Sequence, residues 1–111
     1  MTPQPRTLDH PDPSEIRLEA VLHALSDPVR LQVVRFLAGN GESSCSAIDL
    51  AVSKSTTTHH FRVLREAGVI RQVYRGTAKM SSLRREDLDA LFPGLLDTVV
   101  RAYDAQAARA T

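Results

Sequence analysis

The residues with the most evident chemistry are gathered in one segment, 53–80, which reads SKSTTTHHFRVLREAGVIRQVYRGTAKM. It carries six basic side chains against one acidic side chain, Glu66, so its net charge is +5 before its two histidines are counted. The whole chain has a net charge of +1, and the remaining sequence therefore sums to −4. Positive charge collected in one polar segment is typical of a surface that binds a polyanion. The basic residues are Lys54, Arg62, Arg65, Arg71, Arg75 and Lys79.

The first half of this segment predicts a helix over residues 54–67, with Ser53 as its N-cap and Gly68 at its end. At about 100° per residue, Thr57, Phe61 and Leu64 share one side, which we expect to face the core. The opposite side presents short hydroxyls, an imidazole and a guanidinium. Such groups can read base edges, and residues near a helix N-terminus do so in helix-turn-helix proteins. The expected DNA-binding residues of this helix are Lys54, Ser55, Thr56, Thr58, His59 and Arg62.

The second half predicts a β-hairpin. Residues 69–74 and 78–83 have strand character, and Arg75-Gly76-Thr77 forms the turn between them. Arg75 and Lys79 flank the tip. A basic hairpin beside a helix in the major groove can reach phosphates or the minor groove, so we expect both residues to contact DNA.

The other elements must hold this unit in place. Ser14 can cap a helix that runs to residue 24, Asp27-Pro28 begins a second helix that ends at 39–41, and 44–51 predicts a short third helix. Residues 85–108 are helical, with a break at Pro93-Gly94. This order predicts a mainly α fold with a β-hairpin wing, a winged helix-turn-helix domain over 14–108. Four prolines within residues 1–13 predict a flexible tail.

The first and last helices each carry an apolar stripe. A winged-helix core uses only part of that surface, so we expect the excess to be buried in a two-fold homodimer, the alternative being that these helices complete one monomeric core. The expected interface residues are Leu18, Val21, Leu22, Leu95, Leu96, Val99, Val100 and Tyr103.

Composition narrows the class further. No apolar run approaches the roughly 20 residues that span a bilayer. We therefore expect a cytoplasmic location and no membrane partner. One cysteine, Cys45, rules out an intrachain disulfide. No motif places a nucleophile beside a base and no glycine-rich phosphate loop is present, which argues against an enzyme. His59 and His60 are adjacent on a helix and point about 100° apart, so they are poorly placed to chelate one ion.

The stretches ALSDPVRLQVVRFL (24–37) and SKSTTTHHFRVLREAGVIRQVYRGTAKMSSL (53–83) resemble the ArsR/SmtB family of bacterial winged-helix repressors. The resemblance implies a homodimer of winged-helix subunits that binds a palindromic DNA operator overlapping a promoter. It also implies release from DNA when an effector binds, often a metal ion.

The metal-binding part of the resemblance does not carry over. Where family members often place a Cys-x-Cys pair, this chain reads Ser44-Cys45-Ser46-Ala47, and its last helix contains no histidine. We therefore assign no metal ligand and no cofactor, and the effector is unknown. Three alternatives stay open: a metal- or redox-responsive repressor using Cys45 or the pair His10 and His23, Cys45 as a buried core residue, and a winged helix used as a protein-interaction module.

Overall fold

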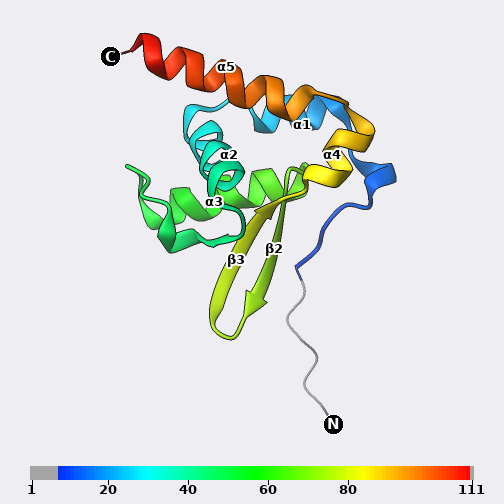
Figure 1. The fold of residues 1–111 in the computed structure, drawn as a ribbon. Coiled ribbons are helices and arrows are strands. Elements are labelled where there is room, and N and C mark those ends of the chain that lie inside the picture. The colour runs from blue at the N-terminus through cyan, green and yellow to red at the C-terminus, as the bar shows by residue number, and fades with distance from the viewer. Residues whose placement is uncertain (1–7, 111) are drawn as a thin grey trace.

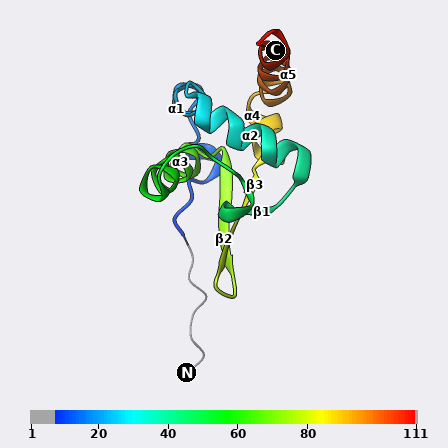
Figure 2. The same cartoon turned by 90° about the vertical axis from the view of Figure 1, so that its left-hand side faces the viewer.

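A computed structural model of the chain describes residues 8–110 (Figure 1). Five α-helices and a three-stranded antiparallel sheet follow one another in the predicted order, so the mainly α winged helix-turn-helix fold is confirmed for this part of the chain. The helices form the upper body of the molecule, and a hairpin projects away from them (Figure 2). The helices are α1 (Leu18–Ala24), α2 (Pro28–Asn40), α3 (Lys54–Glu66), α4 (Arg85–Leu91) and α5 (Leu95–Arg109), and the strands are β1 (Ser43–Ser44), β2 (Ile70–Arg75) and β3 (Ala78–Leu83).

The sheet has the order β1-β3-β2, with β3 in the centre. The strands β2 and β3 pair from Ile70 opposite Leu83 to Arg75 opposite Ala78, which leaves Gly76 and Thr77 as the turn. Gly76 has a φ of 64°, a left-handed conformation that suits glycine in a two-residue hairpin turn. The predicted hairpin is confirmed, and its turn is one residue shorter than expected.

The core lies where the helices meet the end of the hairpin that is opposite its turn. Val21 and Ala24 enter it from α1, Val33 from α2, and Phe61 and Leu64 from α3, and each of these side chains is at most 2% exposed. α5 packs against α2 and α4 and lies across the top of the molecule in Figure 1. The core therefore fixes α3 on one side only and leaves its other side to solvent.

The local signals for α2 and for the break before α5 are confirmed. Asp27 caps α2, because its side chain accepts hydrogen bonds from the backbone N–H groups of Val29 and Arg30 at 2.8 and 3.1 Å. Pro28 occupies the first helical position, where its missing N–H has no cost. Gly94 adopts a φ of 81° between α4 and α5, which separates the last helical region into two.

Two helix predictions are wrong. Ser14 does not cap a continuous first helix: Pro13–Glu15 forms a single 3₁₀ turn capped by Asp12, and α1 begins only at Leu18. The short helix expected at 44–51 is replaced by β1 and a 3₁₀ turn, Cys45–Ala47. Ser43 and Ser44 pair with Ser81 and Met80 of β3 instead, so strand pairing outweighs the local helical pattern.

The proline-rich segment also differs from its prediction. Residues 1–7 lie outside the described residues, but residues 8–13 form defined contacts with β2 and with Arg84, the residue before α4. Gln72 donates its backbone N–H to Nε2 of His10 at 2.9 Å, and Arg84 donates to the carbonyl oxygen of Pro11 at 2.7 Å. The prolines prevent residues 8–13 from forming a helix, but they do not make the segment flexible, because these hydrogen bonds to distant residues hold it in place.

The expected interface set needs a correction as well. Val21 and Leu96 are 1% and 2% exposed, because both face the core of their own subunit, so they are not available to a partner. Leu18 and Leu22 are 43% and 46% exposed. The remaining members, Leu95, Val99, Val100 and Tyr103, are half-buried.

Candidate nucleic-acid interface

The polar side of α3 is exposed to solvent. The N-terminus of the helix is fixed by Ser53, whose hydroxyl accepts the backbone N–H of Thr56 at 3.2 Å. Thr58 donates its hydroxyl hydrogen to the carbonyl oxygen of Lys54 at 3.1 Å, and the residue is exposed. The structure brings all six residues expected on this helix to one exposed surface: Lys54, Ser55, Thr56, Thr58, His59 and Arg62.

The opposite side of α3 faces the core, as the helical pattern predicts. Phe61 and Leu64 are buried, and Thr57 is half-buried. The hydroxyl of Thr57 also donates a hydrogen bond to the carbonyl oxygen of Ser53 at 3.0 Å. The helix is therefore held along one side, and its exposed polar face has a fixed orientation.

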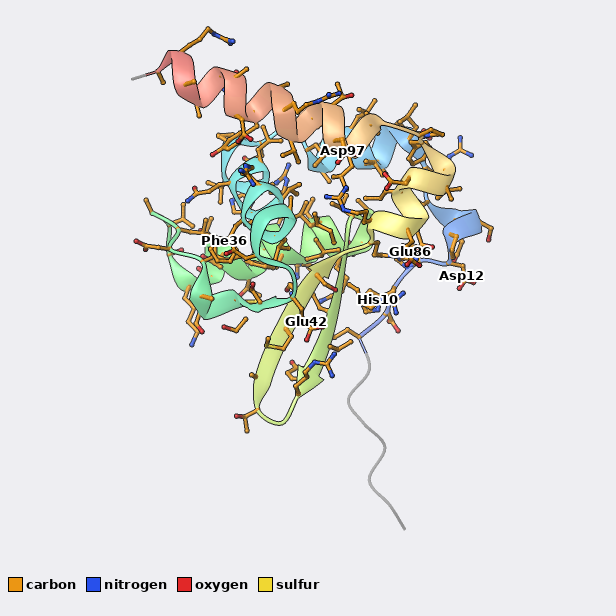
Figure 3. The ribbon with its side chains drawn as sticks, in the orientation of Figure 1. His10, Asp12, Phe36, Glu42, Glu86 and Asp97 are labelled. Atoms are coloured by element: carbon orange, nitrogen blue, oxygen red, sulfur yellow. The ribbon has the colours of Figure 1, made fainter. Side chains whose placement is uncertain are left out.

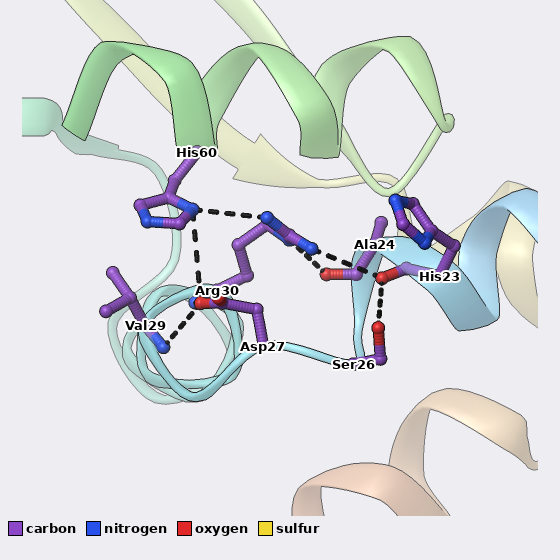
Figure 4. Close-up of polar contacts among 7 residues, drawn as sticks. All are labelled: His23, Ala24, Ser26, Asp27, Val29, Arg30 and His60. Atoms are coloured by element: carbon purple, nitrogen blue, oxygen red, sulfur yellow. Dashed lines mark hydrogen bonds and ion pairs between the residues drawn. The ribbon is translucent and has the colours of Figure 1, made fainter. Parts of the chain in front are cut away.

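A buried polar cluster adds to this fixation (Figure 4). The Arg30 guanidinium donates to the carbonyl oxygen of Ala24 at 2.6 Å and to that of His23 at 3.3 Å, at the C-terminal end of α1. It also lies 3.2 Å from Nδ1 of His60 on α3, and because arginine can only donate, that nitrogen accepts. One side chain of α2 thus joins the end of α1 to the middle of α3.

Asp27 completes the cluster. Its Oδ1 lies 3.9 Å from Nδ1 of His60. Partial burial acts to raise the pKa of Asp27, but the backbone hydrogen bonds from Arg30 and Val29, with the nearby positive charge, hold that pKa below its ordinary value. The carboxylate therefore stays ionised at the N-terminus of α2, where negative charge is favoured. The sequence predicted Asp27 at the start of α2 but gave Arg30 no role, although Arg30 belongs to the ALSDPVR stretch.

The wing residues are arranged differently from the expectation of two free basic tips. Arg75 is paired with Glu42, which precedes β1, and its Nη2 donates to Oε2 at 3.1 Å. This contact raises the pKa of Arg75 and lowers the pKa of Glu42. The Nζ of Lys79 lies 6.0 Å from the centre of the Tyr74 ring, at the outer limit of a cation–π contact. Both cations lie on the hairpin, but Arg75 is neutralised by a partner that the sequence reading missed.

A second polar network, also missed, joins α3 to the sheet. Arg65 donates to Oε1 of Gln72 at 2.8 Å, and Nε2 of Gln72 donates to the hydroxyl of Ser81 at 3.1 Å. Gln72 is 1% exposed and Ser81 is 0% exposed. The available signal was strand alternation, which places Gln72 on the same face as the buried Ile70. The wing is therefore coupled to the C-terminal half of α3.

Residues proposed as sensors are not assembled into a metal site. Residues 8–110 contain no group of three His, Cys, Asp or Glu side chains that could hold an ion, so the donor set does not fit the metal that the family resemblance implies. Cys45 is half-buried, with its Sγ 3.9 Å from Nε2 of Gln72 and 4.0 Å from the hydroxyl of Ser81. In the same range, no helix is long and apolar enough to cross a membrane.

The geometry defines the class of protein. An exposed polar helix, a second helix that fixes it through the core and Arg30, and a basic hairpin beside them make up a winged helix-turn-helix, a DNA-binding architecture. A protein-family model for a helix-turn-helix domain matches residues 25–73, which contain α2, α3 and most of β2.

Comparisons with known proteins give the family. The chain is 35% identical over 82 residues to an uncharacterized HTH-type transcriptional regulator, YceK, of Bacillus subtilis (strain 168), covering 71% of this chain and 82% of that protein. It is also similar to the crystal structure of the transcriptional repressor BigR from Xylella fastidiosa (25% identity, TM-score 0.55, 68% of this chain and 85% of that one). A crystal structure of a possible transcriptional regulator for arsenical resistance has 26% identity and a TM-score of 0.59, over 86% of this chain and 99% of that one.

The chain belongs to the ArsR family of winged helix-turn-helix transcriptional regulators, as the resemblance indicated. It is a DNA-binding transcriptional regulator, and its relatives are regulators rather than enzymes.

Proposed function

We propose that the chain is a homodimeric transcriptional repressor that reads a palindromic operator with α3 and contacts the flanking DNA with the wing. The observation that carries this proposal is the division of α3 into a fixed side and an exposed polar side. A helix that reads bases needs both, because its side chains must enter the groove from a defined position.

The exposed residues of α3 suit different parts of the duplex. Thr56 and His59, with the neighbouring hydroxyls of Ser55 and Thr58, lie in the N-terminal part of the helix and suit base edges, where hydroxyl and imidazole groups can donate or accept. The Lys54 and Arg62 side chains suit phosphates, which position the helix without reading sequence. Arg62 lies 3.3 Å from Nδ1 of His59, so its guanidinium also orients that imidazole.

The wing supplies charge beside this helix. Arg75 belongs to β2 and Lys79 to β3. These strands form the hairpin that projects from the same body as α3 (Figure 1). We infer that both contact the sugar-phosphate backbone, with Arg75 leaving Glu42 to do so.

Exposed apolar residues on α1 and half-buried ones on α5 support the dimer. Leu22 and Val99 line a hollow of about 270 Å³ between α1, α2 and α5, and Leu18 is exposed beside them on α1. A two-fold dimer formed through this surface must hold its two copies of α3 about 34 Å apart to reach successive major grooves. The proposed interface is the corrected set: Leu18, Leu22, Leu95, Val99, Val100 and Tyr103.

A mobility-shift assay with the DNA upstream of the chain's own coding sequence tests the DNA part. Thr56→Ala and His59→Ala should each weaken specific binding by about 1–3 kcal/mol, the value of a base-reading contact. Thr98→Ala is the matched control, because Thr98 is exposed on α5, away from α3. Unchanged binding by both α3 variants would refute the assignment of α3.

Light scattering after size-exclusion chromatography tests the dimer. The wild type should elute as a dimer at micromolar concentration, and Leu22→Glu, which places a charge on the exposed apolar surface, should elute as a monomer. A monomeric wild type would contradict the proposal.

A further inference from the structure

A hollow of about 450 Å³ lies between residues 8–13, β2 and α4, on the side of the wing that carries the N-terminal segment. Figure 3 shows His10 and Asp12 on this segment, next to the hairpin and to α4. Hollows of this size are typical of small-molecule sites. Neither the recognition surface of α3 nor the apolar surface of α1 and α5 uses it.

Hydrogen bonds between distant parts of the chain build its walls. His10 accepts the backbone N–H of Gln72, which ties the N-terminal segment to β2. The Arg84 side chain, only 4% exposed, donates from Nε to Asp87 at 3.0 Å and from Nη1 to the Pro11 carbonyl oxygen at 2.7 Å. The hollow is therefore bounded on these sides by fixed backbone and by an arginine whose charge is already balanced.

The charge that is not balanced belongs to Arg71 on β2. Its side chain is exposed at the hollow and has no hydrogen bond or ion pair among residues 8–110. Burial lowers the pKa of His10, and three nearby guanidinium groups lower it further, which indicates a positive potential at this end of the hollow. The carboxylate of Asp12, also at the hollow, is exposed.

The rest of the lining is partly apolar. Leu8, Pro11 and Val73 are half-buried around the hollow and offer contact area to a hydrocarbon or an aromatic ring. A free guanidinium beside such a surface matches a ligand with one anionic group and an apolar body, because arginine binds carboxylates in a bidentate fork.

We propose that this hollow binds a small organic carboxylate, with Arg71 recognising the carboxylate group and Leu8, Pro11 and Val73 contacting the apolar body. A ligand in this position touches both the N-terminal segment and β2, so binding changes how the wing is held. The effect on the wing rests on the proposed function, because it alters DNA affinity only if the wing contacts DNA. Binding of the carboxylate does not depend on the proposed function.

Amide chemical shifts of the ¹⁵N-labelled full chain during titration with benzoate test the site. The amides of His10, Arg71 and Val73 should shift saturably. Arg71→Met should weaken binding by about tenfold or more, since it removes a charge-assisted contact. Arg101→Met is the matched control, because Arg101 is exposed on α5, and should bind benzoate as the wild type does. Benzyl alcohol, which has the same ring without the charge, should bind more weakly than benzoate.

The absence of saturable shifts, or equal affinity in the wild type and Arg71→Met, would overturn the site. Equal binding of benzyl alcohol would overturn the role of the carboxylate. Because this titration contains no DNA, its result is independent of whether the chain binds an operator. Adding benzoate to the mobility shift then tests the consequence for the wing: operator affinity should change in the wild type and not in Arg71→Met, and no change in the wild type would overturn that consequence.

Discussion

Arg75, the last residue of β2, and Glu42, which precedes β1, form a two-point ion pair that ties the tip of the wing to the connection that follows α2. The side chain of Arg75 is 65% exposed, so solvent screens the pair. Its main effect is on charge, because the carboxylate neutralises a guanidinium that we propose contacts phosphates.

The first prediction is that Glu42→Gln tightens DNA binding. The substitution frees Arg75 for a phosphate contact, so affinity should rise on all sequences and its salt dependence should steepen by about one counterion. Thermal unfolding should change little, since the pair is exposed. Fluorescence anisotropy over a series of salt concentrations measures both effects.

The control for this prediction is the same substitution in an Arg75→Gln background. There the gain from Glu42→Gln should be smaller, because no guanidinium is left to be released. An equal gain in both backgrounds would mean that Glu42 acts only by repelling DNA.

The second prediction concerns the buried cluster that orients α3. Arg30→Met keeps much of the side chain's volume but removes the donors that satisfy two carbonyl oxygens and Nδ1 of His60. Each buried acceptor left unpaired costs about 1–3 kcal/mol, so the free energy of unfolding in urea should fall by a comparable amount or more. Arg35→Met, which removes an exposed ion pair with Asp104, should cost less than about 1 kcal/mol. Equal losses would show that the cluster is not structural.

The residues of α3 and the hairpin could be predicted because their signals are local. The helix cap follows from Ser53, and the buried face of α3 follows from the 3.6-residue pattern through Thr57, Phe61 and Leu64. The hairpin turn follows from Gly76. None of these signals depends on the rest of the chain. The exposed side of α3 follows from the same pattern. The three strands could be predicted only in part, because β1 forms through pairing with β3 rather than through its own two residues.

The features that could not be predicted depend on contacts between distant parts of the chain. An apolar stripe does not distinguish Val21, which enters its own core, from Leu22, which stays exposed one position later. The Arg75–Glu42 pair spans 33 residues, and the His10–Gln72 hydrogen bond spans 62. Sequence spacing cannot predict such pairs, because their residues come together only in the folded chain.

The third prediction compares two glycines with left-handed backbones. Gly68, with a φ of 86°, follows α3, and a Cβ added there would lie 2.6 Å from Cγ1 of the buried Ile16. Gly76→Ala, at the wing turn with a φ of 64°, meets no atom within 4 Å. Both substitutions incur the conformational cost of about 1–2 kcal/mol, but only Gly68→Ala adds overpacking of about 1–3 kcal/mol. The free energy of unfolding in urea should therefore be clearly lower for Gly68→Ala than for Gly76→Ala. The reverse order would contradict the close packing of Gly68 against Ile16.

The fourth prediction is a pH dependence of stability that comes from His10. Burial lowers the pKa of His10 from its ordinary value of 6.5, and its Nε2 must stay unprotonated to accept the backbone N–H of Gln72. The unfolded chain therefore binds a proton that the folded chain resists. This contribution to stability is complete above the ordinary histidine pKa and is lost as the pH falls from there toward the lowered pKa of the folded state.

Urea unfolding at about pH 7.5 and about pH 5.5 measures this dependence. The wild type should lose more stability on acidification than His10→Gln, which can still accept through its amide oxygen but does not titrate. His23→Gln, at an exposed histidine of α1, should retain the wild-type pH dependence. If His10→Gln loses as much stability as the wild type, the contact between His10 and β2 does not govern the response to acid.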